Sequence, residues 1–373
     1  MLRTTADVLV VGGGVIGCAV ARELAGAHLR VVLVEREQTG SGASGAAAGI
    51  LSPQAEADGP SPLLQLGIES RSMFPRLVEE LRAETGIEVP YRTSGTLFLA
   101  LDDEEEAKLE QRYAWQCGAG LRVERISAGR VSTLEPAVSA GVRIALRFPY
   151  DHQIDNVTLT RALAASAERR GVEFRTSAEV SSVLVQGGRV EGVAIGPGRI
   201  YAPRVVICGG AWSALIDCGG PELPVTPVRG QMVALESERA RLDRVVFTER
   251  GYLVQRLDGR ILVGSTTEHA GYEPRATAKG VGDLLALAQR VVPALEQASI
   301  AGIWAGLRPG TKDGLPILGA AGSPWPEGLF FATGHFRNGI LLAPLTARLI
   351  AEELLTGRTS LPLDPFQASR FRS

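Results

Sequence analysis

The stretch that decides the fold is DVLVVGGGVIGCAVARELAGAHLRVVLVE, residues 7–35. An apolar run, Val8 to Val11, ends in three glycines, and a helix pattern of small residues begins at once. A second apolar run, residues 31–34, ends in an acid. Strand, glycine turn, helix, strand and acid in this order predict the first unit of a dinucleotide-binding α/β fold.

Gly12, Gly14 and Gly17 fall in the G-x-G-x-x-G register. The first permits a tight turn, the second lets the backbone approach a pyrophosphate, and the third lets the helix pack on the strand. Free N–H groups at the helix start then face the phosphates. Glu35 is expected to accept hydrogen bonds from an adenosine ribose, and its charge argues against a 2′-phosphate. The motif fits FAD and NAD equally, and the alternative is a glycine-rich turn in an ordinary α/β unit.

Composition restricts the partners. With 373 residues the chain exceeds one usual core, so we expect two domains. The chain has 39 Lys and Arg residues against 41 Asp and Glu residues, and the basic residues form no block. This balance argues against nucleic acid and anionic membranes as partners. Neither a secretory signal nor a membrane span is expected, which predicts a cytoplasmic protein. The four cysteines and four histidines form no C-x-x-C pair or zinc-type cluster, so no metal site is expected.

The pattern along the chain predicts a parallel fold interrupted by insertions. Residues 39–50, TGSGASGAAAGI, have little side-chain bulk, so their backbone could press against a flat ligand; a flexible linker is the alternative. We expect helices over residues 62–85, kinked at Pro75, and over 155–170, capped by Asp155 or Asn156. A third helix is expected to be capped by Asp102 or Asp103 and to end at about Trp115. A hairpin is expected with its turn at Gly187-Gly188. Residues 205–208 have the pattern of a buried parallel strand. The spaced strands after about residue 219 are expected to form an antiparallel sheet.

Two late segments are the most informative: WAGLRPGTKDGLPILG, residues 304–319, and FATGHFRNGILLAP, residues 331–344. The second predicts a strand, a glycine turn and a helix from about Gly339 to Leu355, whose N-terminus could face an anionic ring. In the first, the planar guanidinium of Arg308 could give a carboxylate two parallel hydrogen bonds. The alternative for Arg308 is a surface arginine beside a Pro-Gly turn.

From Gly12 to about Leu355 the sequence resembles the D-amino-acid-oxidase-like FAD oxidoreductases, most closely their glycine-oxidising members in thiamine biosynthesis. The segments GHFRNG, 334–339, and GLRP, 306–309, carry this resemblance most specifically. It implies an α/β Rossmann-like FAD-binding domain (residues 1–85, 151–218 and 309–373), interleaved with an antiparallel-sheet substrate domain (residues 86–150 and 219–308). It also implies non-covalent FAD, because related enzymes that tether flavin use a late cysteine and none follows Cys218.

The resemblance assigns cofactor contacts residue by residue. It places the glycine turn at the pyrophosphate, Glu35 with Arg36 at the adenosine end, the Val180 backbone at the adenine, and residues 335–341 around the ring. The implied cofactor residues are Gly12, Gly14, Val15, Ile16, Gly17, Glu35, Arg36, Ala43, Ser44, Ala48, Gly49, Ile50, Val180, His335, Phe336, Arg337, Asn338, Gly339, Ile340 and Leu341.

The resemblance also implies the substrate contacts. Arg308 would clamp the substrate carboxylate with help from Tyr252, and Arg337 would lie at the substrate's other edge. Met232, Tyr252 and Thr266 are candidate walls, and Met232 could equally be sheet core. No side chain is assigned a catalytic role, and His335 is interpreted as a structural histidine bonded to backbone in preference to an acid–base group.

The resulting hypothesis is an FAD-dependent oxidase of glycine and other small amines, such as sarcosine and D-alanine. The neutral amine would lose a hydride from Cα to flavin N5, the imine would give glyoxylate and ammonia or feed thiazole synthesis, and O₂ would become H₂O₂. The family suggests a homotetramer and a hand-off to thiazole synthase. The alternatives are a D-amino-acid dehydrogenase that reduces a quinone, a non-catalytic FAD-binding partner module, and a nicotinamide dehydrogenase.

Overall fold

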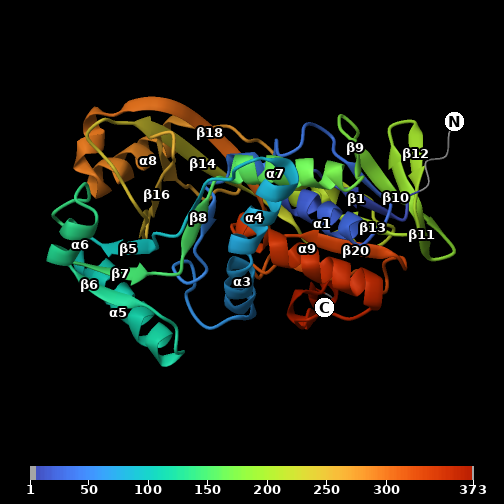
Figure 1. Ribbon diagram of the computed structural model, residues 1–373, viewed down its shortest axis with the longest axis horizontal. Helices are drawn as coiled ribbons and strands as arrows, with labels where there is room; N and C mark the ends of the chain where they lie inside the picture. The colour runs from blue at the N-terminus through green and yellow to red at the C-terminus, as the bar shows by residue number, and fades with distance from the viewer. Residues whose placement is uncertain (1–5, 372–373) are drawn as a thin grey trace.

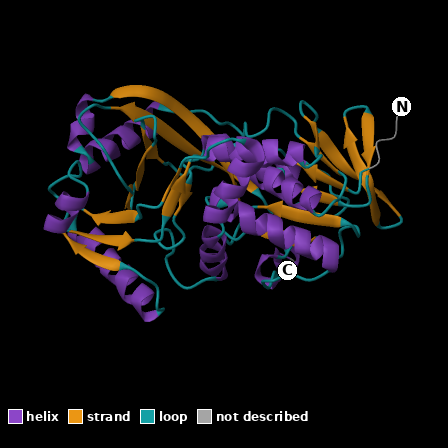
Figure 2. Ribbon diagram, in the orientation of Figure 1, coloured by secondary structure: helices purple, strands orange, loops and turns teal. Residues whose placement is uncertain are grey.

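The computed structural model describes residues 6–371, which form two lobes along the long axis of the molecule (Figure 1). One lobe is built on a six-stranded sheet and the other on an eight-stranded sheet. Figure 2 shows helices packed around both sheets and two long strands of the second sheet that extend towards the first lobe.

The six-stranded sheet begins with the stretch quoted above. β1 (Val8–Val11), α1 (Val15–Gly26) and β2 (Val31–Val34) follow one another as predicted. β1 pairs in parallel with β2 on one side and with β13 (Val205–Ile207) on the other. Every residue of these three strands is buried, as is typical of parallel strands covered on both faces. The remaining strands are β9 (Glu173–Arg175), β20 (Leu329–Thr333) and the antiparallel edge strand β19 (Ile317–Ala320).

Helices cover one face of this sheet. α1 packs against α7 (Asn156–Arg169) and α9 (Gly339–Thr356). Leu24, Leu163 and Leu349 belong to this core, and each is at most 1% exposed. Burial of one such side chain contributes roughly 1.5–3 kcal/mol. α7 begins as predicted, because Asp155 accepts a hydrogen bond from the Thr158 backbone N–H at 2.7 Å.

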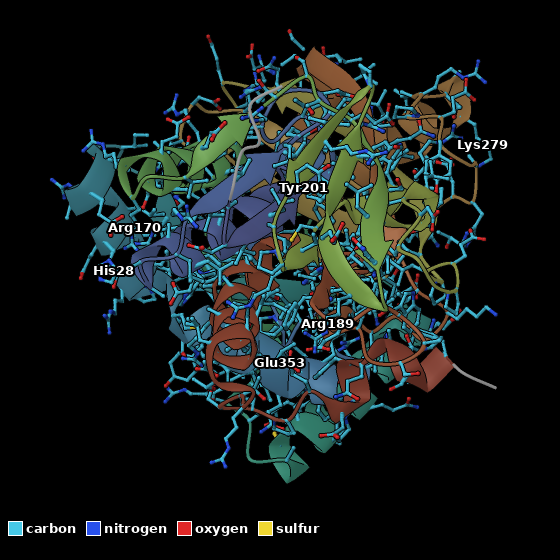
Figure 3. All side chains as sticks on the ribbon, turned by 90° about the vertical axis from the view of Figure 1, so that its right-hand side faces the viewer. His28, Arg170, Arg189, Tyr201, Lys279 and Glu353 are labelled. Carbon is cyan, nitrogen blue, oxygen red and sulfur yellow. The ribbon has the colours of Figure 1, made fainter. Side chains whose placement is uncertain are left out.

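A three-stranded antiparallel sheet covers the other face: β10 (Val180–Gln186), β11 (Arg189–Ile195) and β12 (Gly198–Tyr201). Figure 3 looks along the long axis and shows this sheet, which carries Tyr201, towards the viewer. Gly187 and Gly188 form the predicted hairpin turn with φ of 58° and 77°, a left-handed conformation that glycine adopts without strain. β12 was not predicted.

The second lobe is organised by a sheet in the order β18-β14-β17-β16-β15-β5-β7-β6. Its strands are β18 (Ser299–Gly310), β14 (Thr226–Glu236), β17 (Ile261–Gly264), β16 (Gly251–Gln255), β15 (Val245–Thr248), β5 (Thr96–Ala100), β7 (Ile144–Phe148) and β6 (Glu124–Ser127). The expected antiparallel pairing fails at one place, because β15 and β5 run parallel. These two strands come from separate insertions, so no hairpin connection requires them to be antiparallel. The two-domain division stays a prediction.

The pairing of β14 with β18 positions the site. The two strands are antiparallel and place Val228 opposite Arg308 and Gly230 opposite Gly306. α8 (Ala278–Val291) packs on β14 and β17 on one face of this sheet. Arg308 is therefore held in a long two-stranded ribbon and does not lie on a surface turn, as the alternative interpretation proposed.

The helical structure predicted over residues 62–85 is confirmed in extent, but the helix breaks there where a kink was expected. The chain forms α3 (Pro62–Ser72) and α4 (Phe74–Thr85), which meet at Met73. Pro75 lies in the first turn of α4, where its missing N–H needs no partner, so the proline starts a helix instead of bending one. α5 (Asp103–Gly118) begins after Asp102, whose side chain caps it as predicted.

The other α-helices and strands of the described residues are short: α2 (Ala43–Ala46), β3 (Ile50–Leu51), β4 (Tyr91–Arg92), α6 (Ala128–Leu134) and β8 (His152–Ile154). β8 joins β3 and β4 in a small sheet. Between residues 6 and 371, no helix combines the length and apolar character needed to cross a bilayer.

Candidate active site

A cavity of about 920 Å³ extends from the glycine turn after β1 to the inner strands of the eight-stranded sheet. This volume lies at the upper end of the range for small-molecule sites. Most of the predicted cofactor residues line it: Gly12, Gly14, Val15, Ile16, Glu35, Arg36, Ala43, Ser44, Ala48, Gly49, Ile50, Val180, His335, Phe336, Arg337, Gly339 and Ile340. Three do not. Gly17 packs under the turn, Asn338 precedes α9, and Leu341 is buried in the helical core.

The glycine turn has the shape that a pyrophosphate requires. Gly12 has a φ of 109°, and a Cβ there would overlap the Cys208 carbonyl. A Cβ on Gly17 would overlap the Gly12 carbonyl, so strand and helix meet only because both positions lack a side chain. The Val15 N–H donates to the Ser44 hydroxyl at 2.9 Å, so the loop after β2 is tied to the helix start.

Glu35 has a structural function that the sequence did not reveal. One carboxylate oxygen accepts from the Gly13 N–H at 2.6 Å, and the other accepts from the Glu37 N–H at 2.8 Å. The carboxylate thereby fixes the glycine turn against the end of β2 while it faces the cavity. Neighbouring Arg36 lies over the ring of Trp212, with Cζ 3.8 Å from the ring centroid. Trp212 also lines the cavity and was missed by the sequence analysis.

At the other end of the cavity, Arg308 is fixed by neutral partners. Its Nη1 donates to the Thr266 carbonyl at 3.1 Å, and its Nη2 donates to the Ser265 hydroxyl at 2.5 Å. Burial lowers the pKa of Arg308, and the nearby Tyr252 hydroxyl opposes that shift. Gly230 is required on the facing strand, because a Cβ there would lie less than 3.0 Å from the guanidinium.

The walls around Arg308 come from the sheet. Met232 and Tyr252 both line the cavity, and the Tyr252 hydroxyl donates to the Met232 sulfur at 3.5 Å. Met232 is also part of a core cluster, so both interpretations of this residue apply. Thr266 was expected as a wall, but it does not line the cavity. Its carbonyl holds Arg308 and its hydroxyl accepts from the Gln231 N–H, so it supports the site from behind.

His335 is buried, and its Nε2 lies 3.1 Å from the hydroxyl of Thr346. The predicted bond to backbone is therefore replaced by a bond to a side chain of α9. Burial lowers the pKa of His335 to about 3, so its ring is neutral at physiological pH. A neutral imidazole bonded to a helix fits the predicted structural role better than acid–base catalysis.

Two charged residues of the cavity were not predicted, Glu179 and Glu56. Glu56 lines the cavity together with Arg308 and Arg337. Burial raises the pKa of Glu56, while Arg337, Arg308 and Arg112 lower it. No motif or periodicity distinguishes Glu56 from the other acids of the chain, because the tertiary structure alone brings residues 52–57 to the two arginines.

The residues present fit FAD. The glycine turn can admit a pyrophosphate, a carboxylate stands at the end of β2, and the N-terminal residues of α9 line the same cavity as the part-buried guanidinium of Arg308. These features define the class as flavin-dependent oxidoreductases. The chain belongs to the FAD dependent oxidoreductase family, whose model matches residues 7–353.

Known proteins similar to this chain agree with that assignment. Glycine oxidase of Geobacillus kaustophilus is 39% identical over 98% of this chain and 97% of its own length. The crystal structure of glycine oxidase from that organism has a TM-score of 0.94 at 37% identity and covers 99% of this chain and 100% of its own. A bifunctional ThiO/ThiG protein of Synechocystis is 35% identical over 99% of this chain but only 55% of its own length. The predicted family, fold class, FAD cofactor and enzyme class, an FAD-dependent amino-acid oxidase, are confirmed.

Proposed function

We propose that this protein oxidises glycine and other small amines, such as sarcosine and D-alanine, with O₂ as the electron acceptor. For glycine, the amine, O₂ and water would give glyoxylate, ammonia and H₂O₂. The observation that carries the proposal is the fixed guanidinium of Arg308 in the same cavity as the glycine turn. FAD, when bound, supplies the redox chemistry by accepting a hydride from the substrate Cα and passing the electrons to O₂.

Arg308 orients the substrate. A guanidinium has five N–H donors, and two of them are used on Thr266 and Ser265. Three donors remain, which is enough for two parallel hydrogen bonds to a carboxylate. Because those two partners fix the guanidinium plane, the substrate carboxylate would be held in one orientation and its Cα at one place.

The surrounding side chains favour a small substrate and leave proton transfer to the substrate itself. Met232, Tyr252 and Phe247 close the sheet side of the cavity, and Phe247 lies 5.6 Å from Tyr252 between ring centroids. The neutral ring of His335 is bonded to Thr346. The amine would therefore bind deprotonated, and its lone pair would drive loss of the hydride without a side-chain base.

For the remaining residues we propose the roles assigned by resemblance: Tyr252 assists Arg308, Arg337 lies at the substrate's other edge, and the cofactor residues hold FAD non-covalently. We also propose a cytoplasmic homotetramer. The imine would be delivered to thiazole synthesis for thiamine. The similarity to about half of a bifunctional ThiO/ThiG protein supports this hand-off.

The experiment is a substrate panel followed by flavin absorbance without O₂, repeated with Arg308→Ala. The purified protein should be yellow and should bleach with glycine. Arg308→Ala should weaken amino-acid substrates by about 2–4 kcal/mol and barely affect amines that lack a carboxylate. A colourless protein, or flavin that stays oxidised with every amine, overturns the proposal. An oxygen electrode separates the oxidase from a quinone-reducing dehydrogenase, which would reduce dyes and release little peroxide.

A further inference from the structure

The carboxylate of Glu56 has no direct partner in the cavity. Its side chain accepts no hydrogen bond, and no ion pair within 4.0 Å joins it to a cation, in the part of the chain that the structure describes. A half-buried carboxylate costs free energy unless something compensates its charge. The arginines of the same cavity offset part of this cost at longer range, while burial still raises the pKa of Glu56.

The backbone around Glu56 is fixed on both sides. The Ala55 N–H donates to the Asp151 carboxylate at 3.0 Å, and Asp151 is fully buried and paired with Arg71 at 2.5 Å. The Ala55 and Ala57 carbonyls both accept from Nη1 of Arg112. The segment therefore holds Glu56 at a defined place, while its side chain is left to the cavity.

The charges at this end of the cavity do not cancel. It contains the part-buried guanidinium of Arg308, the guanidinium of the exposed Arg337 and one carboxylate. Of the cations that act on Glu56, Arg337 has the strongest effect and Arg308 comes second. Arg308 itself is held by a carbonyl and a hydroxyl, which leave its positive charge uncompensated. One net positive charge remains, which matches one substrate carboxylate.

We propose that Glu56 determines the charge specificity of the pocket: by compensating Arg337, it restricts substrates to amines that carry a single carboxylate. An amine with a second carboxylate would bring a like charge towards Glu56, and like charges at close range cost several kcal/mol. Without Glu56, Arg337 would become available to that second carboxylate. This inference rests on the proposed function, since it assumes that Arg308 binds the first carboxylate.

The test compares sarcosine with iminodiacetate, two secondary amines that differ by one carboxylate, on the holoenzyme. Glu56→Gln removes the charge and keeps the shape of the side chain. We expect the ratio of kcat/KM for iminodiacetate to that for sarcosine to rise about tenfold or more, the lower part of the effect expected for like charges. Glu69→Gln is the matched control, because it makes the same charge change at an exposed position outside the cavity, and it should leave the ratio unchanged.

A binding measurement separates this inference from the proposed function. Methoxyacetate and diglycolate are the oxygen analogues of the two amines and cannot be oxidised as amines, so flavin absorbance reports their dissociation constants without turnover. Glu56→Gln should tighten diglycolate relative to methoxyacetate about tenfold. If neither amine is turned over but the relative dissociation constants still shift, the proposed amine oxidation is wrong and the proposed effect of Glu56 on charge specificity holds.

A second variant, expected to change the ligand preference in the opposite direction, keeps the proposal testable if Glu56→Gln misfolds. Arg337→Gln leaves Glu56 uncompensated, so the preference for methoxyacetate over diglycolate should increase about tenfold. The proposal is overturned if Glu56→Gln leaves both ratios within twofold of the wild type. Should Glu56→Gln not fold, an unchanged ratio in Arg337→Gln overturns it equally.

Discussion

Replacing Gly230 by alanine should disable substrate binding without touching the cofactor. Gly230 has an ordinary strand conformation, so alanine adds no backbone strain. The added Cβ would lie less than 3.0 Å from three atoms of the Arg308 guanidinium. The guanidinium cannot yield freely, because Thr266 and Ser265 hold both of its terminal nitrogens.

Relief of that overlap requires the guanidinium to move by roughly 1 Å, and a misplacement of this size costs about 100-fold in rate. We therefore expect kcat/KM for glycine to fall about 100-fold, equivalent to about 2.7 kcal/mol in the activation free energy. The flavin content should stay at the wild-type level. The assay is peroxide release at several glycine concentrations on protein with a confirmed flavin spectrum.

The matched control is Gly302→Ala on the facing strand, where the Cβ would meet Trp304 at an ordinary distance of 3.7 Å. It should behave like the wild type. If the effect of Gly230→Ala passes through Arg308, it should disappear in an Arg308→Ala background. The reasoning is refuted if Gly230→Ala retains kcat/KM within threefold of the wild type, or if the two changes are additive.

Two further predictions concern stability. Glu84 binds Arg22 and Arg170, and desolvation is outweighed by these hydrogen bonds, so its pKa falls to about 2. Because the folded pKa lies below the unfolded value, the stabilisation is complete above pH 4.5 and is lost as the pH falls towards 2. Glu84→Gln should therefore cost about 2–3 kcal/mol at pH 7 and much less at pH 3 in denaturant unfolding, and an equal loss at both pH values would contradict this. Thr346→Val leaves the buried Nε2 of His335 without its partner and should lower the free energy of unfolding by about 1–3 kcal/mol at pH 7. The control is Thr356→Val at an exposed position of the same helix, which should lower the free energy of unfolding by less than half as much.

The cofactor half of the site could be predicted because its chemistry is local. The packing of Gly17 on the Gly12 carbonyl and the bond between Gly13 and Glu35 lie within one strand-turn-helix-strand unit, so a short motif predicts them, although Gly12 also packs against the distant Cys208 carbonyl. The same holds for the cap at Asp155 and the hairpin turn at Gly187-Gly188. The break at Met73 was missed because a proline in an apolar helix pattern fits a kink and a new first turn equally well.

The sequence by itself determined the dinucleotide turn and the order of the cofactor fold, because side-chain periodicity and turn conformation act over a few residues. It made Arg308 the candidate carboxylate ligand through the resemblance of the GLRP segment. Only the tertiary structure decided what surrounds Arg308. Gly230 faces it through strand pairing, Thr266 and Ser265 hold it from another strand end, and Glu56 lines the same cavity from a loop fixed by Asp151. Contacts between segments far apart in the chain depend on strand pairing and loop packing in three dimensions, and no local pattern encodes them.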